Sequence, residues 1–399
     1  MSSQTTFKTE DQYMAPFFVK QKISIDRGEG VFVWDEAGTR YIDFTAGWGV
    51  TCIGHAHPVI SEALARQSKK ILQNPNSGLT YSPARAELLS VLMKVLPPNL
   101  THVFFSSSGA EANDAAIKLA RKVTGRLDVI STHQSFHGRT ISTASATGQA
   151  SHRDKFNPLM PNYRFVNYGD LADLEQALDE KVAAFIIEPI QGEGGVHIPS
   201  ETYLKTASAL CRKNGTLMIA DEVQTGFCRT GPMFVTGGMG VEVDFLTMAK
   251  GIAGGFPFGG FAMTTEVASK LEIGDHGGTY CGNPLGCAVA AAVIGYLKDH
   301  NVSANVEKMG RISLDTMAQW KVKYPAAIRD IRGKGLLILI EFADADMAKK
   351  VSDECLARKL FVRQTQGIGI RVFPALTITE AELKEGMEIM AGAVKAVVG

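Results

Sequence analysis

The 399-residue sequence lacks features that mark several classes of protein. No apolar run approaches the roughly 20 residues that a membrane-spanning helix needs. Polar residues stand at the N-terminus, where a secretory signal would be apolar. The six cysteines are scattered and form no C-x-x-C pair, so no disulfide framework is expected. These absences predict a cytoplasmic protein with free thiols and no membrane segment.

An excess of one charge is also missing. The 41 Lys and Arg residues balance the 41 Asp and Glu residues, which argues against a nucleic-acid binder. Neither G-x-G-x-x-G nor G-x-x-x-x-G-K-[ST] occurs, so nucleotide-binding folds are disfavoured. His55, His57, His133 and His137 lack acidic or thiolate companions at ligand spacing, so no metal site is expected.

Short apolar runs alternate with amphipathic helical stretches over much of the chain, a pattern that predicts an α/β layer with a mostly parallel sheet. Two of the runs, AAFIIE and TLMIAD, are apolar almost throughout, as expected for strands covered on both faces. The expected strands are His102–Ser106, Asp128–Ser131, Ala183–Glu188, Thr216–Asp221, Phe245–Ala249 and Phe258–Met263, and the expected helices lie at about 57–71, 84–96, 109–123, 171–180 and 201–213.

The pattern changes after about residue 295. A long helix is expected at about 302–322, followed by strands and a last helix at about 379–397, which together resemble a smaller α+β domain. The expected strands are Ile328–Arg332, Leu336–Glu341, Leu360–Arg363 and Ile368–Phe373. We expect an N-terminal segment at 1–45 that packs on this domain, a large domain at 46–295 and the small domain at 296–399.

The segment FFSSSGAEANDAAIK combines the end of an apolar strand, a run of serines with a glycine, and an Ala-rich helix. Free backbone N–H groups at the helix start, beside serine hydroxyls, are typical of a phosphate cradle. An ordinary serine N-cap explains the same pattern equally well.

Acidic residues follow two of the buried strands. Glu188 and Asp221 stand at strand ends and Glu193 lies in a glycine loop, and ligands of open α/β sheets bind beyond the carboxyl ends of the strands. A helix cap for Glu188 and a buried ion pair for Asp221 are the structural alternatives.

Lys250 follows another apolar run and precedes a glycine-rich loop. Lysines are usually solvated, but these neighbours predict burial, and a buried lysine is a candidate amine nucleophile. An anion cradle, a strand-end carboxylate and a buried lysine together fit pyridoxal phosphate, which needs all three.

Several long motifs now support a family assignment. The sequence resembles the class III pyridoxal-phosphate aminotransferases, in particular their acetylornithine/ornithine subgroup. The motifs cover about residues 100–290, and GHAHP and IRVFPALTIT extend the resemblance to nearly the whole chain; the others are SSSGAEAN, SFHGRT, EPIQGEGG, DEVQTGF, AKGIAGGFP and HGGTYCGNPLGCA.

The resemblance implies fold type I, with a mostly parallel seven-stranded sheet flanked by helices and a small α+β domain. It assigns the catalytic lysine to Lys250, which would bind the cofactor aldehyde and shuttle a proton, and the partner of the ring nitrogen to Asp221. The other cofactor positions are Ser108, Gly109 and Ala110 at the phosphate, Phe136 and Val223 on the ring faces, Gln224 at the ring hydroxyl, His137 and Glu188 nearby, and Thr279 reaching the neighbouring subunit's phosphate. The resemblance therefore implies a homodimer in which each active site uses residues of both subunits.

The resemblance also implies how substrates bind. Arg139 would hold the distal carboxylate of the donor, and Arg371 the α-carboxylate of glutamate, since a guanidinium binds a carboxylate bidentately. Glu193 would pair with Arg371 when an ω-amine is bound. Gly278 is included with these positions, and Trp48 stands where a smaller aliphatic residue is usual, so it would reshape the donor pocket.

The expected function is therefore transfer of an amino group from N-acetylornithine or ornithine to 2-oxoglutarate, with no nucleic-acid or membrane partner. The alternatives are a 4-aminobutyrate, diamine or other ω-amino acid aminotransferase, a related racemase or decarboxylase, and a non-catalytic scaffold. The presence of both Lys250 and Asp221 argues against the scaffold.

Overall fold

Three β-sheets carry the fold in a computed structural model that describes residues 3–399. The largest has seven strands in the order β4-β10-β9-β8-β7-β5-β6, and β10 alone runs antiparallel to its neighbours in this sheet. The mostly parallel sheet expected from the sequence is thus confirmed. Its strands are β4 (Leu100–Ser106), β5 (Asp128–Thr132), β6 (Tyr163–Val166), β7 (Val182–Ile187), β8 (Leu217–Asp221), β9 (Phe245–Met248) and β10 (Gly259–Thr264).

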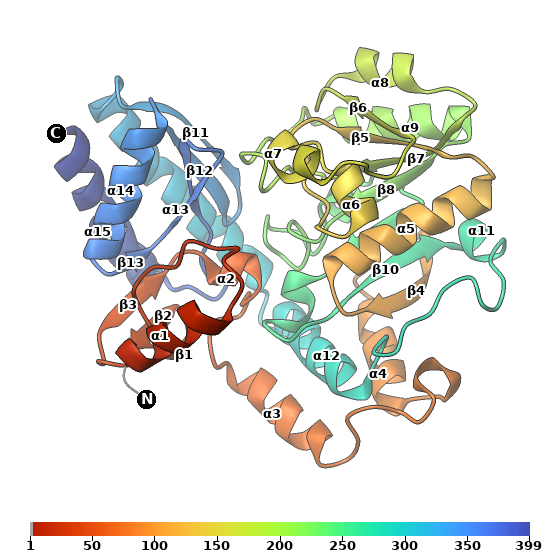
Figure 1. Ribbon diagram of the computed structural model, residues 1–399, viewed down its shortest axis with the longest axis horizontal. Helices are drawn as coiled ribbons and strands as arrows, with labels where there is room; N and C mark the ends of the chain where they lie inside the picture. The colour runs from red at the N-terminus through yellow and green to blue at the C-terminus, as the bar shows by residue number, and fades with distance from the viewer. Residues whose placement is uncertain (1–2) are drawn as a thin grey trace.

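The central sheet is covered on both faces. In β7, Ala184 and Ile186 pack into one apolar cluster with helix α5 (Gly109–Thr124), whereas Phe185 and Ile187 pack into another with α9 (Tyr203–Asn214). Successive strand residues point to opposite faces, so a strand between two helical layers must be apolar throughout. Figure 1 shows these layers.

The remaining helices complete this part of the chain. Helix α12 packs against α3 and α4 beside the central sheet, at the bottom of Figure 1. The bounds are α3 (Pro58–Ser68), α4 (Pro83–Leu92), α6 (Ile141–Ala146), α7 (Ala150–Arg153), α8 (Leu171–Ala177), α10 (Val235–Met239), α11 (Thr265–Ala268) and α12 (Pro284–Asp299), with 3-10 turns η1 (Ser77–Leu79), η2 (Asp154–Phe156) and η3 (Lys250–Ala253).

A second, antiparallel sheet follows in sequence and has the order β11-β12-β15-β14. Its strands are β11 (Ile328–Lys334), β12 (Leu337–Phe342), β14 (Arg363–Thr365) and β15 (Gly369–Val372), and its helices are α13 (Val302–Lys323), α14 (Ala345–Ala357) and α15 (Glu380–Val398). A capping box formed by Thr379 and Glu382 starts α15.

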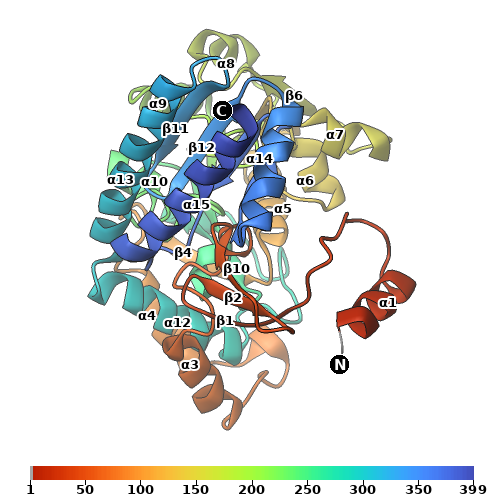
Figure 2. The same ribbon diagram turned by 90° about the vertical axis from the view of Figure 1, so that its left-hand side faces the viewer.

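The third sheet joins the two ends of the chain. Strands β1 (Ile25–Glu29), β2 (Phe32–Asp35) and β3 (Arg40–Asp43) form a meander, and β3 pairs in parallel with β13 (Leu360–Phe361). The single strand expected at Leu360–Arg363 is therefore two short strands in different sheets. Short α2 (Ala46–Gly49) follows, and α1 (Ser3–Tyr13), which buries none of its residues, stands apart in Figure 2.

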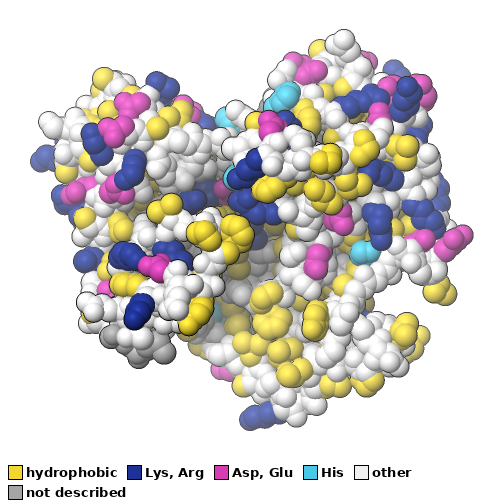
Figure 3. Space-filling view, viewed as in Figure 1, with side chains coloured by type: hydrophobic (Ala, Val, Ile, Leu, Met, Phe, Trp, Pro, Cys, Tyr) yellow, Lys and Arg dark blue, Asp and Glu magenta, His cyan; other side chains and the backbone are white. Residues whose placement is uncertain are grey.

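No helix within residues 3–399 combines the length and apolar character needed to cross a membrane. Figure 3 shows the surface hollowed between the central-sheet part and the part that carries the smaller sheets, with Lys and Arg side chains beside the hollow.

Candidate active site

A cavity of about 450 Å³ lies at the carboxyl ends of the central parallel strands. Asp221 ends β8, Lys250 follows β9, and Glu188 follows β7, so three neighbouring strands each deliver one charged group. Parallel strands that end at one sheet edge bring together residues that are distant in the sequence. Twelve positions singled out from the sequence line this cavity: Ser108, Gly109, Ala110, Phe136, His137, Arg139, Glu188, Glu193, Asp221, Val223, Gln224 and Lys250.

Lys250 is the only lysine that lines this cavity. It opens η3 with a positive φ of 45°, a backbone conformation that is unusual for a residue with a side chain. Desolvation lowers the pKa of its amine, and the carboxylates of Glu193, Asp221 and Glu188 oppose that shift only in part. A larger fraction of this amine is therefore neutral, and nucleophilic, than for a solvated lysine.

Asp221 is buried at the cavity floor and accepts hydrogen bonds on both oxygens. Oδ2 lies 2.7 Å from His137 Nδ1 and 2.7 Å from Asn113 Nδ2, and Oδ1 accepts from the backbone N–H of Val223 at 3.1 Å. These hydrogen bonds fix the orientation of the carboxylate. The arrangement provides a fixed negative charge that faces the cavity.

Glu188 is equally buried but plays a different part in the geometry. Its two oxygens accept from the backbone N–H groups of Phe136, at 2.9 Å, and Gly192, at 3.1 Å. Burial raises its pKa to about 7, His137 and the two N–H groups oppose the rise, and nearby Asp221 adds to it. Glu188 therefore joins two loops at the cavity rim.

The start of α5 contributes Ser108, Gly109 and Ala110 to the cavity lining. Ser108 is the N-cap and its Oγ accepts from the N–H of Glu111 at 3.2 Å, while the first-turn N–H groups of Gly109 and Ala110 have no carbonyl within the helix. A Cβ on Gly109 would lie 2.8 Å from Val223 Cγ1, so any side chain there would displace Val223. The serine is thus both a helix cap and a component of the cavity, and the two interpretations of its sequence pattern are compatible.

Glu193 and Arg371 form an ion pair at the side of the cavity. Arg371 is 2% exposed, and its guanidinium lies 2.8 Å from Glu193 Oε1 and 3.3 Å from Gln224 Oε1. Burial acts to raise the pKa of Glu193, but Arg371 and Lys250 outweigh it and hold the pKa below its ordinary value. Arg371 is thereby brought to the site although it does not itself line the cavity.

Three other positions from the sequence lie elsewhere in the single chain. Gly278 and Thr279 are exposed in a loop, where their carbonyls accept from Ser77 Oγ at 3.1 and 2.6 Å. Trp48 has a positive φ of 69°, is 40% exposed and lies beneath Arg363, with 5.2 Å from the guanidinium carbon to the ring centroid. Trp48 does not line the cavity.

The structure also adds residues that the sequence did not single out. Asn113 is 1% exposed, accepts from Thr247 Oγ1 at 2.6 Å, and donates to both Asp221 and the His137 carbonyl. Its position four residues after Gly109 places both on one face of α5, and this spacing was the available signal. Val50, Phe256 and Phe258 also line the cavity, for which no local signal existed.

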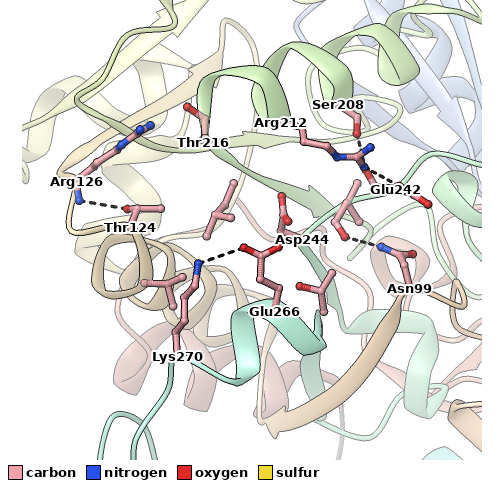
Figure 4. Close-up of a pocket in the computed structure, with 15 residues that line it drawn as sticks. Asn99, Thr124, Arg126, Ser208, Arg212, Thr216, Glu242, Asp244, Glu266 and Lys270 are labelled. Atoms are coloured by element: carbon pink, nitrogen blue, oxygen red, sulfur yellow. Dashed lines mark hydrogen bonds and ion pairs between the residues drawn. The ribbon is translucent and has the colours of Figure 1, made fainter.

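A second cavity, of about 520 Å³, lies at the opposite ends of the strands, near Leu217 and Asp244 (Figure 4). Its charges are largely paired with one another: Arg212 with Glu242 at 2.7 Å and Lys270 with Glu266 at 3.2 Å. None of the sequence-derived site residues lines it. Within residues 3–399, no His, Cys, Asp and Glu side chains are grouped as metal ligands.

The comparisons with known proteins decide the family. Residues 13–394 match the family described as aminotransferase class-III. The chain belongs to this family. The acetylornithine aminotransferase of Methanothermobacter thermautotrophicus is 41% identical over 390 residues, 98% of each chain. The family expected from the sequence motifs is thus confirmed.

Solved structures agree with this class III assignment. An ornithine aminotransferase from Toxoplasma gondii has a TM-score of 0.94 at 32% identity and covers 100% of this chain and 96% of its own. An omega-transaminase from Thermomicrobium roseum has a TM-score of 0.93 at 31% identity, with 100% and 99% covered. This chain is an aminotransferase, and the scaffold alternative is discarded.

Proposed function

We propose that this aminotransferase uses pyridoxal phosphate to transfer the ω-amino group of N-acetylornithine or ornithine to 2-oxoglutarate. The observation that carries the proposal is the ion pair between the buried Arg371 and the partly buried Glu193, beside Lys250. The names of the relatives, acetylornithine aminotransferase and ornithine aminotransferase, support the choice of donor.

The residues that line the cavity fit this cofactor. The start of α5 offers N–H groups and the Ser108 hydroxyl to a phosphate, Asp221 offers a fixed carboxylate to a protonated ring nitrogen, and Lys250 offers an amine to an aldehyde. Phe136 and Val223 supply apolar surface for an aromatic ring. Bound pyridoxal phosphate would supply an electron sink for the carbon that bears the transferred amine.

The protein's own contribution is proton movement and charge. The neutral amine of Lys250 can accept a proton from the substrate carbon at Nζ and return it at the neighbouring position, which is general acid–base catalysis. Asp221, held by Asn113 and His137, keeps its negative charge aimed at one point. Fixed charge in a buried site stabilises developing charge more than water does.

Two arginines would distinguish the two substrates. Glutamate carries a carboxylate next to its reacting amine, which suits Arg371, whereas an ω-amine carries only a CH₂ there and its carboxylate further away, near Arg139. An unpaired guanidinium that faces a CH₂ group would be costly. Glu193 neutralises Arg371 for the ω-amine and turns aside for glutamate.

The second candidate is a 4-aminobutyrate, diamine or other ω-amino acid aminotransferase. Likeness to the Thermomicrobium roseum omega-transaminase favours it. The position of Trp48 outside the cavity removes one reason to expect a narrowed donor pocket, while Val50, Phe256 and Phe258 set its apolar walls.

A homodimer with shared sites is part of the proposal. Large apolar side chains are exposed on the same region as Thr279: Leu79 is 87% exposed, Tyr81 103%, Ile273 108% and Tyr280 67%. Apolar groups gathered in this way mark an interface. A second copy of the chain would cover them and bring its Thr279 to the phosphate position of this chain.

Steady-state assays of the purified holoenzyme with a panel of donors and 2-oxoglutarate test the function. We expect N-acetylornithine or ornithine to give the highest kcat/KM. A clear preference for 4-aminobutyrate or a diamine would select the second candidate, and no transfer to 2-oxoglutarate from any ω-amine would refute both.

A further inference from the structure

The loop that carries Glu193 is fastened by side chains to which no role has been given. The carbonyl of Glu193 accepts from Thr365 Oγ1 at 3.1 Å and from Gln366 Nε2 at 2.8 Å. Two residues later, the carbonyl of Gly195 accepts from Arg332 Nε at 2.9 Å. Three side chains thus hold two carbonyls of one short loop.

These three side chains belong to the sheet that carries Arg371. Arg332 on β11 is in register with Leu339 on β12, which is in register with Arg371 on β15. Thr365 ends β14, the other neighbour of β15, and Gln366 follows it. Glu193 therefore contacts one sheet twice: its carbonyl binds the Thr365–Gln366 corner, and its carboxylate binds Arg371.

The other side of the loop has no free space. A Cβ at Gly192 would lie 1.5 Å from Gln224 Oε1, and a Cβ at Gly194 would lie 2.5 Å from the backbone oxygen of Gln134. Gln191 Nε2 donates to the carbonyl of His133 at 2.8 Å. The backbone is therefore packed against the large domain on one side and bonded to the small sheet on the other.

We propose that Thr365, Gln366 and Arg332 are specificity-determining positioning residues. They fix the backbone of the 192–195 loop, so that Glu193 leaves and rejoins Arg371 by rotation of its side chain alone. This inference rests on the proposed role of Glu193 in the ω-amine half-reaction.

A fixed backbone makes the closed ion pair easy to re-form, because only side-chain torsions are ordered when it closes. Weakening the fastening therefore favours the open state, in which Arg371 is uncovered. The open state suits glutamate and does not suit an ω-amine. Loss of the fastening should shift the ratio of the two half-reactions while leaving the chemistry at Lys250 intact.

The test uses isosteric pairs in the holoenzyme. Thr365→Val removes the hydroxyl and Thr365→Ser retains it. Gln366→Met removes an amide that also donates to Gln149 Oε1 at 3.0 Å. Gln364→Met is its matched control, because Gln364 lies two residues earlier on β14 and its side-chain amide donates to the Ala345 and Gly367 carbonyls and not to the Glu193 loop. The readouts are kcat/KM for each half-reaction and hydrogen exchange of the 192–196 amides by mass spectrometry.

We expect Thr365→Val and Gln366→Met each to lower kcat/KM for the ω-amine roughly threefold to tenfold relative to glutamate, the scale of the lost hydrogen bond to the Glu193 carbonyl. Loop exchange should accelerate in both. Thr365→Ser and Gln364→Met should behave as the unmodified enzyme. In a Glu193→Ala background the same substitutions should no longer change the ratio of the two half-reactions, since the carboxylate that covers Arg371 is already absent.

Equal losses in both half-reactions, or an unchanged ratio with unchanged loop exchange, would overturn the inference. A shift that persists in the Glu193→Ala background would overturn it as well. If Glu193→Ala itself leaves the ratio unchanged, the proposed role of Glu193 fails and this inference falls with it. If Glu193→Ala is the only variant that shifts the ratio, the role of Glu193 stands and the positioning role of Thr365, Gln366 and Arg332 is refuted.

Discussion

At the scale of single residues, burial shifts the pKa values of two ionisable groups of the site in opposite directions. Desolvation lowers the pKa of Lys250 and raises that of Glu188, while Asp221 between them is held by three hydrogen-bond donors. The sequence could predict Lys250, Asp221 and Glu188, because each follows a recognisable buried strand. It did not predict Asn113, whose role arises only when α5 packs over β8.

Lys250→Ala should abolish transamination, because no other lysine lines the cavity to replace its amine. Borohydride reduction of the unmodified holoenzyme, followed by peptide mass spectrometry, should find the cofactor on Lys250. Lys118→Ala is a suitable control, since that amine is bonded to the Asp275 carbonyl outside the cavity. Cofactor attached to any other lysine would contradict the role proposed for Lys250.

Glu188→Gln should change how stability depends on pH. The raised pKa of Glu188, about 7 against 4.5, means that its contribution is fully present below pH 4.5 and is lost as the pH rises through 7. The variant lacks this titration, so its stability relative to the unmodified protein should improve from pH 5 to pH 8, by at most about 3 kcal/mol. Thermal unfolding of both apoproteins across this range measures the change; a constant difference would contradict it.

At the scale of elements, the strands and helices are not all equally predictable from the sequence. The expected strands of the central sheet match the observed ones to within two residues, because runs covered on both faces are apolar throughout. Strand β6, with one buried residue, was missed, as was helix α14. The split of the expected strand at Leu360–Arg363 between two sheets depends on pairing with β3, which no local pattern reports.

The Gly192 loop gives a prediction at this scale. Gly192→Ala should displace the Gln224 amide, whose oxygen lies 1.5 Å from the new Cβ, and so break its contacts with Arg371 and Glu193. We expect a loss of about 1–2 kcal/mol in stability and weaker cofactor binding. Gly295→Ala is the control for an added methyl group, because its Cβ meets no side chain within 4 Å; Gly295 lies within α12, so this variant should keep or raise stability. Denaturant unfolding and cofactor titration measure both effects.

At the scale of the whole molecule, the division into segment 1–45, a large domain at 46–295 and a small domain at 296–399 stays a prediction. Strand β3 of the N-terminal segment pairs in parallel with β13, a strand of the expected small domain. The proposed site uses both domains, with Lys250 from the large domain and Arg371 from the small one. Thr279 is the one proposed cofactor residue that a single chain leaves away from the cavity.

Hybrid dimers test whether Thr279 serves the neighbouring subunit. One chain carries Lys250→Ala and the other Thr279→Ala. If Thr279 acts across the interface, one of the two sites in the hybrid combines an intact Lys250 with an intact Thr279 and regains full cofactor affinity. If Thr279 acts within its own chain, every site that has Lys250 lacks Thr279.

Thr279→Ala homodimers should bind the cofactor roughly tenfold more weakly, the scale of one charge-assisted hydrogen bond. Cofactor titration of purified hybrids should then show one tight site for each dimer that forms a borohydride-stable adduct, whereas only weak adduct-forming sites would place Thr279 in its own subunit's site.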